Sequence, residues 1–198
     1  MFISTSQLSK LMKEAYRGRG IRIGNLEEGL VIIGSSWGLW IDENYIPNKV
    51  KAIVMELAGT LPAEESVFKV SKGEAVPQYE LTLDNYYYIN RMEQISKESA
   101  SRTGVYLDLK YCEYELLQVN HTGKIAMISR KLTELIDPGE IDYNVENEPS
   151  GPCTGLSSGM FFWKNATCTL MLLHSAVPED NPVINILSKI DFEKEVKH

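Results

Sequence analysis

The side chains best suited to acid–base chemistry are few in this chain of 198 residues. Its three histidines are His121, His174 and His198, and imidazole is the side chain that most often works as a general base near neutral pH. His121 lies in an Asn-His-Thr-Gly turn pattern, His174 ends an apolar run, and His198 is the last residue. We therefore interpret all three as surface or packing residues rather than catalytic bases.

The cysteines do not form the close pairs that usually hold zinc. Cys112, Cys153 and Cys168 contain no CxxC spacing, and three thiols leave one over in any disulfide scheme. This pattern predicts no metal site and favours a reducing compartment. Residues 1–16 lack the pattern of a signal peptide, and no stretch approaches 18 uncharged apolar residues. We expect a cytoplasmic protein that makes no contact with a membrane.

Other catalytic patterns are equally weak. The glycines of GRGIRIGN follow a predicted helix rather than a strand, and the chain contains no P-loop, so no cofactor is predicted. The carboxylates of Asp42 with Glu43, and of Glu64 with Glu65, are adjacent pairs that usually point apart. The aromatic runs at 86–88 and 161–163 could stack nucleobases, but packing in the core is the favoured interpretation. The expectation is a protein that is not an enzyme.

The elements that position these residues alternate along the chain. Leu8, Leu11 and Met12 recur at helical spacing, and Ser4 is a candidate N-cap in a capping box with Gln7, although Thr5 or Ser6 could serve instead. Short strands are then predicted in IRIGN, GLVIIG and WGLWID. A second helix follows in IPNKVKAIVMELAGTLP, and two more strands in SVFKV and QYELTL.

From Asp84 the series begins again. The pattern predicts a helix in YYYINRMEQISKES, strands in GVYLDLK, EYELLQVN and KIAMI, a short helix at 129–136, and strands in EIDYNV, GMFFW and TCTLMLLHSA. Leu8 and Val50 are 42 residues apart, and Ile89 and Leu132 are 43 apart. Internal duplication explains this repeated order and spacing of elements, and coincidence is the alternative. The predicted organisation is one half at 1–83, a second at 84–178, and a tail at 179–198 with a short helix after Pro182.

Charge is distributed unevenly between the predicted helices and the rest of the chain. Residues 5–19, 47–59, 88–103 and 129–136 hold 11 basic and 5 acidic residues, whereas the remainder holds 9 basic and 22 acidic residues. Basic residues often occur near helix C-termini, where they favourably meet the helix dipole. The same bias in four helices of a chain with net charge −7 also suits binding to a polyanion.

The order of elements resembles that of the DNA sliding clamps, which act as polymerase processivity factors. MFISTSQLSKLMKEA looks like the first strand and basic helix of a clamp domain, IPNKVKAIVMELAGTLP resembles the segment around the second helix, and TCTLMLLHSAV looks like the last strand. The resemblance covers residues 1 to about 177. It implies an α+β fold of two similar halves, each with an antiparallel sheet and two helices packed on one face.

In that family the helices line the hole of a ring and present basic side chains to duplex DNA. The resemblance therefore implies a trimer of six domains, contacts with a polymerase or clamp loader, and a set of DNA-binding residues. That set is Lys10, Lys13, Arg17, Lys49, Lys51, Arg91, Lys97, Arg130 and Lys131.

Two other functions stay open. The first is an interaction or structural protein of phage or mobile-element origin with no nucleic-acid role. The second is a hydrolase with an unrecognised site, which would need a deep pocket gathering Asp, Glu or His from separate strands. The tail segment NILSKIDF is expected to dock on its own domain, with docking on a neighbouring subunit and mimicry of a clamp-binding peptide as alternatives.

Overall fold

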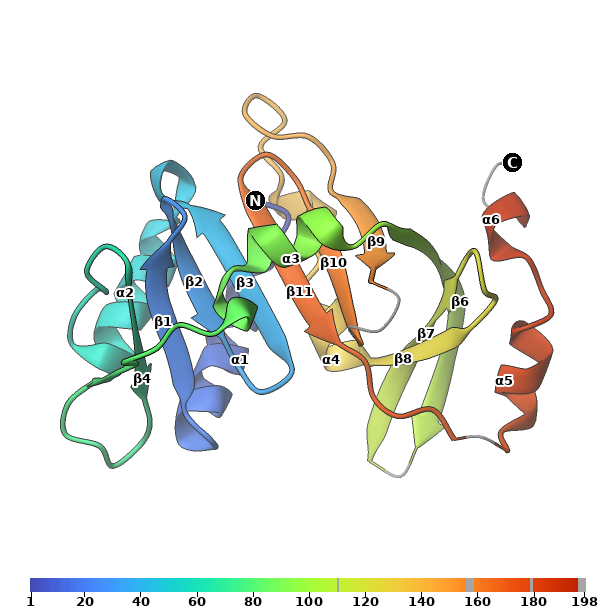
Figure 1. Ribbon diagram of the computed structural model, residues 1–198, viewed down its shortest axis with the longest axis horizontal. Coiled ribbons are helices and arrows are strands. Elements are labelled where there is room, and N and C mark those ends of the chain that lie inside the picture. The colour runs from blue at the N-terminus through green and yellow to red at the C-terminus, as the bar shows by residue number, and fades with distance from the viewer. Residues whose placement is uncertain (110, 156–158, 179, 196–198) are drawn as a thin grey trace.

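One antiparallel sheet dominates the structure, a computed structural model that describes residues 1–109, 111–155, 159–178 and 180–195. Within these ranges eleven strands are joined in the order β5-β4-β1-β2-β3-β11-β10-β9-β6-β7-β8 (Figure 1). The strands are β1 (Ile21–Leu26), β2 (Gly29–Ile33), β3 (Trp37–Asp42), β4 (Ser66–Val70), β5 (Gln78–Tyr79), β6 (Glu98–Leu109), β7 (Cys112–Val119), β8 (Ile125–Ser129), β9 (Ser150–Thr154), β10 (Met160–Lys164) and β11 (Cys168–Leu173). The sheet and its helices confirm the predicted α+β class.

The central strands are buried on both faces of the sheet. Every residue of β2 is buried, as are all residues but the last in β3 and β11. Their sequences are apolar almost without interruption, a pattern typical of strands that are covered on both sides. Other elements must therefore pack on each face.

Three helices cover one face: α1 (Thr5–Arg17), α2 (Asn48–Ala58) and α4 (Arg130–Thr133). Their apolar stripes pack against strand residues such as Leu39 and Leu170, in a cluster to which the helices contribute Leu8, Leu11, Met12, Val50, Ile53, Val54 and Leu132. α2 ends at Gly59, whose φ of 74° lies in the left-handed region that glycine adopts without steric cost. This arrangement confirms the predicted positions of the first two helices.

The helix predicted around Ile89 packs on the opposite face. It forms as α3 (Ile89–Ile95), preceded by the 3₁₀ turn η2 (Asn85–Tyr87), and both lie in front of the sheet in Figure 1. Tyr87 and Ile89 pack against Val31, Phe162 and Met171, whose side chains point away from α1. The expectation that the two helices of the second half pack on one face is thus wrong, because α3 and α4 lie on opposite faces, and α1, α2 and α4 already cover the other one.

The tail forms a third cluster at the end of the sheet. α5 (Pro182–Leu187) confirms the predicted helix, and α6 (Phe192–Glu195) follows it. Ile184, Leu187 and Phe192 pack against the sides of β7 and β8 that face away from α1. The structure therefore confirms the expected docking of the tail on its own chain.

Several local predictions differ from the structure. β6 begins at Glu98, inside the predicted helix, and the predicted strand GVYLDLK lies within it except for residue 110, which is outside the described part. EIDYNV forms turns and the 3₁₀ helix η3 (Pro138–Glu140) rather than a strand, and β9 was not predicted. A further 3₁₀ turn, η1 (Glu43–Tyr45), precedes α2.

The capping box at the start of α1 is also absent. Ser4 occupies the N-cap position without a capping hydrogen bond from its side chain. Gln7 instead donates a hydrogen bond from Nε2 to the carbonyl oxygen of Lys131 at 2.9 Å, so its side chain links α1 to α4. Gln7 thus bonds to a residue that is distant in the sequence instead of completing a local capping box.

The sheet runs without a break across the predicted boundary near Leu83. β3 pairs with β11 from Ile41 opposite Cys168 to Trp37 opposite Leu172. The backbone N–H of Ser4 also donates to the carbonyl of Leu135 at 2.8 Å. The two halves are joined by these pairings, and their division into domains stays a prediction. In the part of the chain that the structure describes, no helix has the length and apolar character needed to cross a membrane.

Candidate nucleic-acid interface

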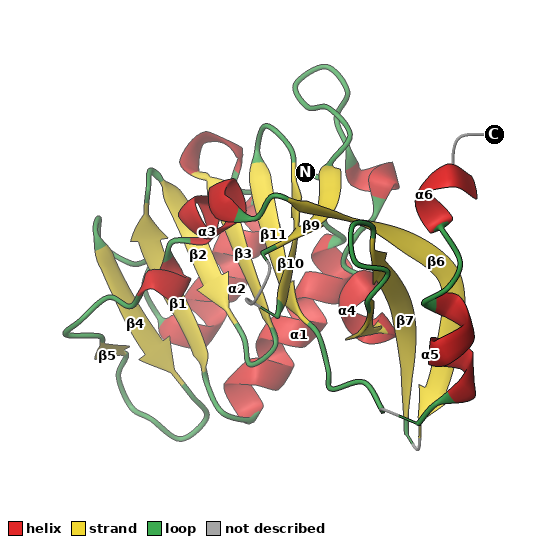
Figure 2. Ribbon diagram, turned by 45° about the vertical axis from the view of Figure 1, so that its right-hand side comes forward, coloured by secondary structure: helices red, strands yellow, loops and turns green. Residues whose placement is uncertain are grey.

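The outer surface of α1, α2 and α4 carries most of the predicted DNA-binding residues, and Figure 2 shows these helices together on one side of the sheet. α1 is amphipathic, with Leu8 and Met12 buried against the sheet and Lys10 and Arg17 exposed. Lys49 is exposed on α2 in the same layer. We call the outer surface of these three helices the helix layer.

Polar contacts tie the three helices to one another. Lys13 of α1 forms an ion pair with Glu56 of α2, with 2.8 Å between Nζ and Oε1. Lys131 of α4 pairs with Glu14 of α1. Lys49 Nζ donates to Thr5 Oγ1 at 3.3 Å. Because these partners are exposed, the pairs orient the helices more than they stabilise the fold.

The helix layer is positively charged on a chain that is acidic overall. α1, α2 and α4 together contain seven basic residues and two acidic ones, in a chain of net charge −7. The two acidic residues, Glu14 and Glu56, each pair with a lysine of the neighbouring helix. Lys10, Arg17 and Lys49 consequently have no ion pair among the described residues. Their charges are available to an anion in solvent.

Arg130 lies at the edge of this layer and is held by three neighbours. Its Nη1 donates to Glu113 Oε2 at 2.7 Å, and its Nε lies 3.5 Å from Glu134 Oε1. The guanidinium also lies 5.0 Å from the ring centroid of Tyr106. These carboxylates neutralise Arg130 more completely than any other basic residue of the helix layer.

Lys51 is turned toward the side of the helix layer. It is half-buried and lines a small pocket of about 100 Å³ with Asn25, Glu43 and Leu61. Its place beside the apolar stripe of α2 explains this direction, because Val50 and Val54 on either side are buried.

Arg91 and Lys97 lie on the opposite face of the sheet. Arg91, on α3, pairs with Glu27 at 2.8 Å and stacks over the ring of Tyr88 at 4.3 Å. Lys97 is exposed between α3 and β6, where it lines a shallow depression with Cys153. The structure therefore brings seven of the nine predicted residues to the helix layer and separates these two from it.

Arg19 was not among the predicted residues and extends the basic surface. It follows the end of α1 and is exposed. Together with Lys131 it lines a groove of about 380 Å³, which also contains Ser35, Ser36 and Ser129. Phosphate oxygens accept hydrogen bonds from cationic and hydroxyl groups such as those in this groove. The sequence signal was the run Gly18-Arg19-Gly20, which ends the helix and leaves the arginine exposed.

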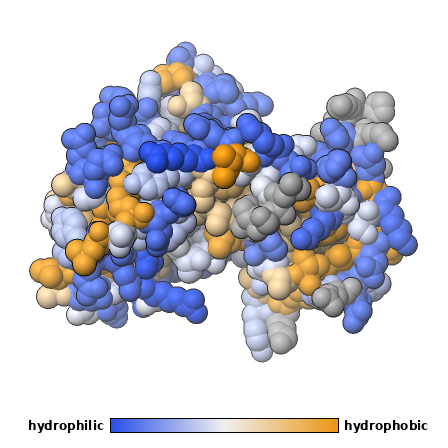
Figure 3. All heavy atoms as spheres, viewed as in Figure 1, coloured by the Kyte–Doolittle hydropathy of each residue, from blue (hydrophilic) through white to orange (hydrophobic). Residues whose placement is uncertain are grey.

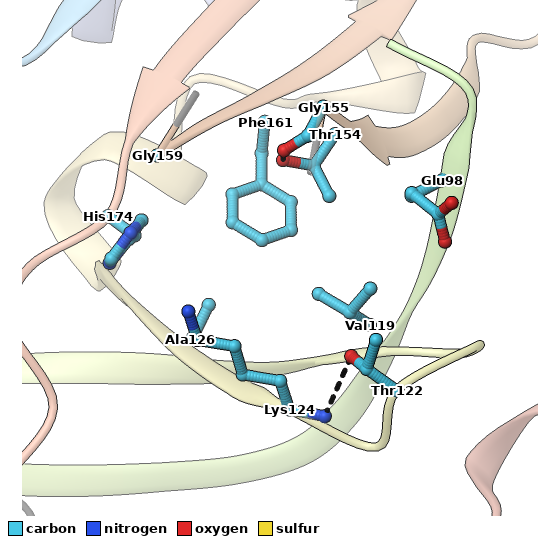
Figure 4. Close-up of a pocket in the computed structure, with 10 residues that line it drawn as sticks. All are labelled: Glu98, Val119, Thr122, Lys124, Ala126, Thr154, Gly155, Gly159, Phe161 and His174. Carbon is cyan, nitrogen blue, oxygen red and sulfur yellow. Dashed lines mark hydrogen bonds between the residues drawn. The ribbon is translucent and has the colours of Figure 1, made fainter. Parts of the chain in front are cut away.

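A separate pocket contains one of the histidines. Figure 4 shows His174 on one side of this pocket and Glu98 on the other, with Phe161 between them. The volume is about 230 Å³. His174 Nδ1 donates to the carbonyl of Ser175 at 2.9 Å. The pocket gathers Glu98 of β6 and His174, which directly follows β11, yet no nucleophilic side chain is hydrogen-bonded to His174 among the described contacts.

The remaining candidates for chemistry differ in their surroundings. Tyr87, Phe161, Phe162 and Trp163 are buried, which confirms core packing for the aromatic runs. His121 is exposed in the β7–β8 turn, whereas His198 lies outside the described residues. Within those residues, no group of three His, Cys, Asp or Glu side chains could hold a metal ion.

Comparison with known proteins gives no match for this chain among family models, curated proteins or solved structures. We therefore infer function from the geometry and charge of the chain itself.

Proposed function

We propose that this chain is a non-enzymatic, clamp-like protein that holds duplex DNA through its helix layer and supports processivity in replication or repair. The observation that carries the proposal is the positive helix layer of an acidic chain. Its helices supply lysine and arginine for phosphate contacts, while the acidic remainder repels DNA from other surfaces.

The contacts would be weak and independent of sequence. Lys10 and Lys49 end in flexible, solvated ammonium groups, and Arg17 ends in a guanidinium at the C-terminal end of α1. Such side chains bind phosphate oxygens without reading base edges. Because each phosphate contact releases counterions, affinity should fall steeply with salt, and the protein should move along the duplex.

Retention on DNA would come from closure of several copies into a ring. In this arrangement the helix layers face the duplex, and the sheets form the outside of a trimer. The two ends of the sheet, β5 and β8, are the edges at which neighbouring copies would meet. A polymerase or a clamp loader would be the protein partner of such a ring.

Charge reversal on α1 tests the DNA contacts. The double variant Lys10→Glu/Arg17→Glu should weaken binding to a fluorescent duplex at least tenfold in 100 mM salt. It should also reduce the magnitude of the slope of log K against log salt by about 2, since each lost phosphate contact accounts for about 0.9. Both side chains lack an ion pair within the described residues, so the thermal midpoint should change little.

The matched control is Lys97→Glu/Lys189→Glu, which changes the net charge equally. Both lysines are exposed and lie away from the helix layer. This variant should retain most of the affinity. Equal losses in the two variants would show that only net charge matters, and unchanged binding by both would reject the DNA function.

An interaction protein without DNA is the second candidate. It is favoured by large apolar side chains at the β5 end of the sheet, where Val76, Tyr79 and Leu81 are exposed. Apolar groups beside a sheet edge are typical of a surface that pairs with another chain. A duplex that shows no salt-sensitive binding, together with a stable assembly of copies, would support this function.

A further inference from the structure

The tail occupies a groove on β7 and β8 through contacts that recognise its backbone. Gln118 lies at the centre of the groove and is 2% exposed. Its Nε2 donates to the carbonyl oxygens of Leu187 at 3.0 Å and Ile190 at 2.6 Å, and its Oε1 accepts from the N–H of Phe192 at 3.2 Å. Both hydrogens of the amide and its oxygen are thus used on the backbone of the tail.

Apolar side chains provide the rest of the groove. Leu116, Ile125 and Met127 form its floor and contact Ile184 and Leu187 of the tail. The opposite sides of the same strands are already packed against the helix side of the sheet. Besides the tail, partly buried side chains such as Val105 and Val177 pack against the same cluster. Departure of the tail would expose the apolar floor to water and break the three hydrogen bonds of Gln118.

The β7–β8 turn is shaped to admit the tail closely. Gly123 has a φ of 69°, and a Cβ at this position would lie 2.9 Å from the carbonyl oxygen of Ser188. Glycine is needed both for the left-handed conformation and for the approach of this carbonyl. The groove is therefore fitted to a chain segment and not only to apolar groups.

Residues within the tail define the start of its helix α5. Asn181 Oδ1 accepts hydrogen bonds from the backbone N–H groups of Val183 at 3.0 Å and Ile184 at 3.5 Å, and Pro182 occupies the first helical position. Residues 176 and 178, which lead to the tail from β11, are exposed. Figures 1 and 2 place α5 and α6 at one end of the molecule, alongside β6–β8.

We propose that the β7–β8 groove is a peptide-docking site that also takes the tail of a second copy of this chain, so that tails exchange between copies. A second copy supplies the same apolar anchors and the same backbone turn that Gln118 recognises. Figure 3 shows apolar surface around the tail in this region, and Ile186 of α5 is itself 62% exposed. The proposal does not depend on DNA binding.

A labelled peptide of residues 180–195 tests this docking on the full chain. In the variant Leu187→Asp the chain's own tail should leave the groove, because a carboxylate cannot be buried against Leu116 without cost. This variant should bind the wild-type peptide at least tenfold more tightly than the wild-type chain does. A peptide that itself carries Leu187→Asp should not bind.

The matched groove variant is Gln118→Glu, which keeps the shape of the side chain and replaces its NH₂ donor by an oxygen. Added to Leu187→Asp, it should remove peptide binding, since two carbonyl oxygens would then face a carboxylate. Should Leu187→Asp unfold the chain, Asn181→Ala serves instead: it weakens only the helix cap of the tail and should improve peptide binding about fivefold. A folded variant with a released tail that binds no peptide would overturn the proposal.

Discussion

Burial changes the chemistry of single residues in this chain, and Cys168 is the clearest case. Its side chain lies at the start of β11 inside the core. Loss of hydration raises the pKa of the Cys168 thiol to about 12, because the thiolate would have to be formed away from water. The Sγ donates to Asn165 Oδ1 at 3.6 Å, an acceptor that favours the protonated form. This thiol should therefore be unreactive in the folded protein.

The raised pKa of Cys168 predicts a loss of stability at alkaline pH. The unfolded chain loses this proton near pH 8.5, whereas the folded chain keeps it up to about pH 12. The contribution is therefore complete below pH 8.5, and above it the free energy of unfolding should fall by about 1.4 kcal/mol per pH unit. Urea titrations from pH 8 to 10 should show this extra slope in the wild type and not in Cys168→Ala. Parallel curves would contradict the prediction.

At the scale of elements, two glutamates of β7 form ion pairs in contrasting environments. Arg102 donates to both carboxylate oxygens of Glu115, from Nε to Oε1 and from Nη2 to Oε2 at 2.8 Å, and the side chain of Glu115 is 1% exposed. Arg130 binds Glu113 on the same strand β7, where the carboxylate is 42% exposed. A buried carboxylate depends on its partner far more than an exposed one does.

Replacing each arginine by methionine should therefore have unequal effects. Arg102→Met leaves Glu115 buried without its partner and should reduce the free energy of unfolding by about 2 kcal/mol, less than for a fully buried pair because Arg102 is itself half-exposed. Arg130→Met should change the free energy of unfolding much less, because Arg130 and Glu113 are both exposed. Chemical denaturation of both variants measures the difference. Equal effects would mean that burial of Glu115 does not control the strength of the pair.

At the scale of the whole molecule, the sheet joins the two parts of the chain and separates two different surfaces. The helix layer on one face is basic, and α3 and the tail occupy the other face. β5 ends the sheet on one side and β8 on the other, where the backbone N–H of Ser175 donates to the carbonyl of Met127 at 2.8 Å and covers part of the edge. The shape is thus compatible with a closed assembly whose inner surface is the helix layer.

The proposed ring predicts the mass of the protein in solution. Light scattering coupled to size-exclusion chromatography in moderate salt should give about three times the mass of one chain, with little change on dilution. Lys10→Glu/Arg17→Glu should keep this mass, because both residues lie on α1 and not on the edge strands β5 and β8. A monomer at every concentration would remove the ring, and DNA binding by such a monomer would have to be explained without topological closure.

Local patterns predicted much of the fold. The strands around Ile23, Ile32 and Leu39 lie where alternating or continuous apolar runs placed them, and α1 and α2 follow their apolar stripes. The failures occurred where tertiary contacts outweigh local preference. Residues 98–103 have acceptable helical sequence, but pairing with β9 and β7 makes them part of β6. β9 has a weak pattern, and its neighbours β10 and β6 define it.

The candidate site was predictable in composition and not in arrangement. Basic residues in the predicted helices were visible in the sequence, including Lys10 and Arg17. Their pairing was not, because Lys13 meets Glu56 and Lys131 meets Glu14 across large separations in the chain. The same limit applies to Arg91, whose helix gave no sign of which face of the sheet it would cover.

The sequence by itself determined the α+β class, the positions of most elements and the excess of positive charge in the helices, because each depends on neighbours within a few residues. Only the tertiary structure decided which face each helix covers, which basic residues stay unpaired and where the tail docks. An apolar stripe shows that one side of a helix will be buried, but it does not specify the partner. That choice is made by packing among segments that are distant in the chain.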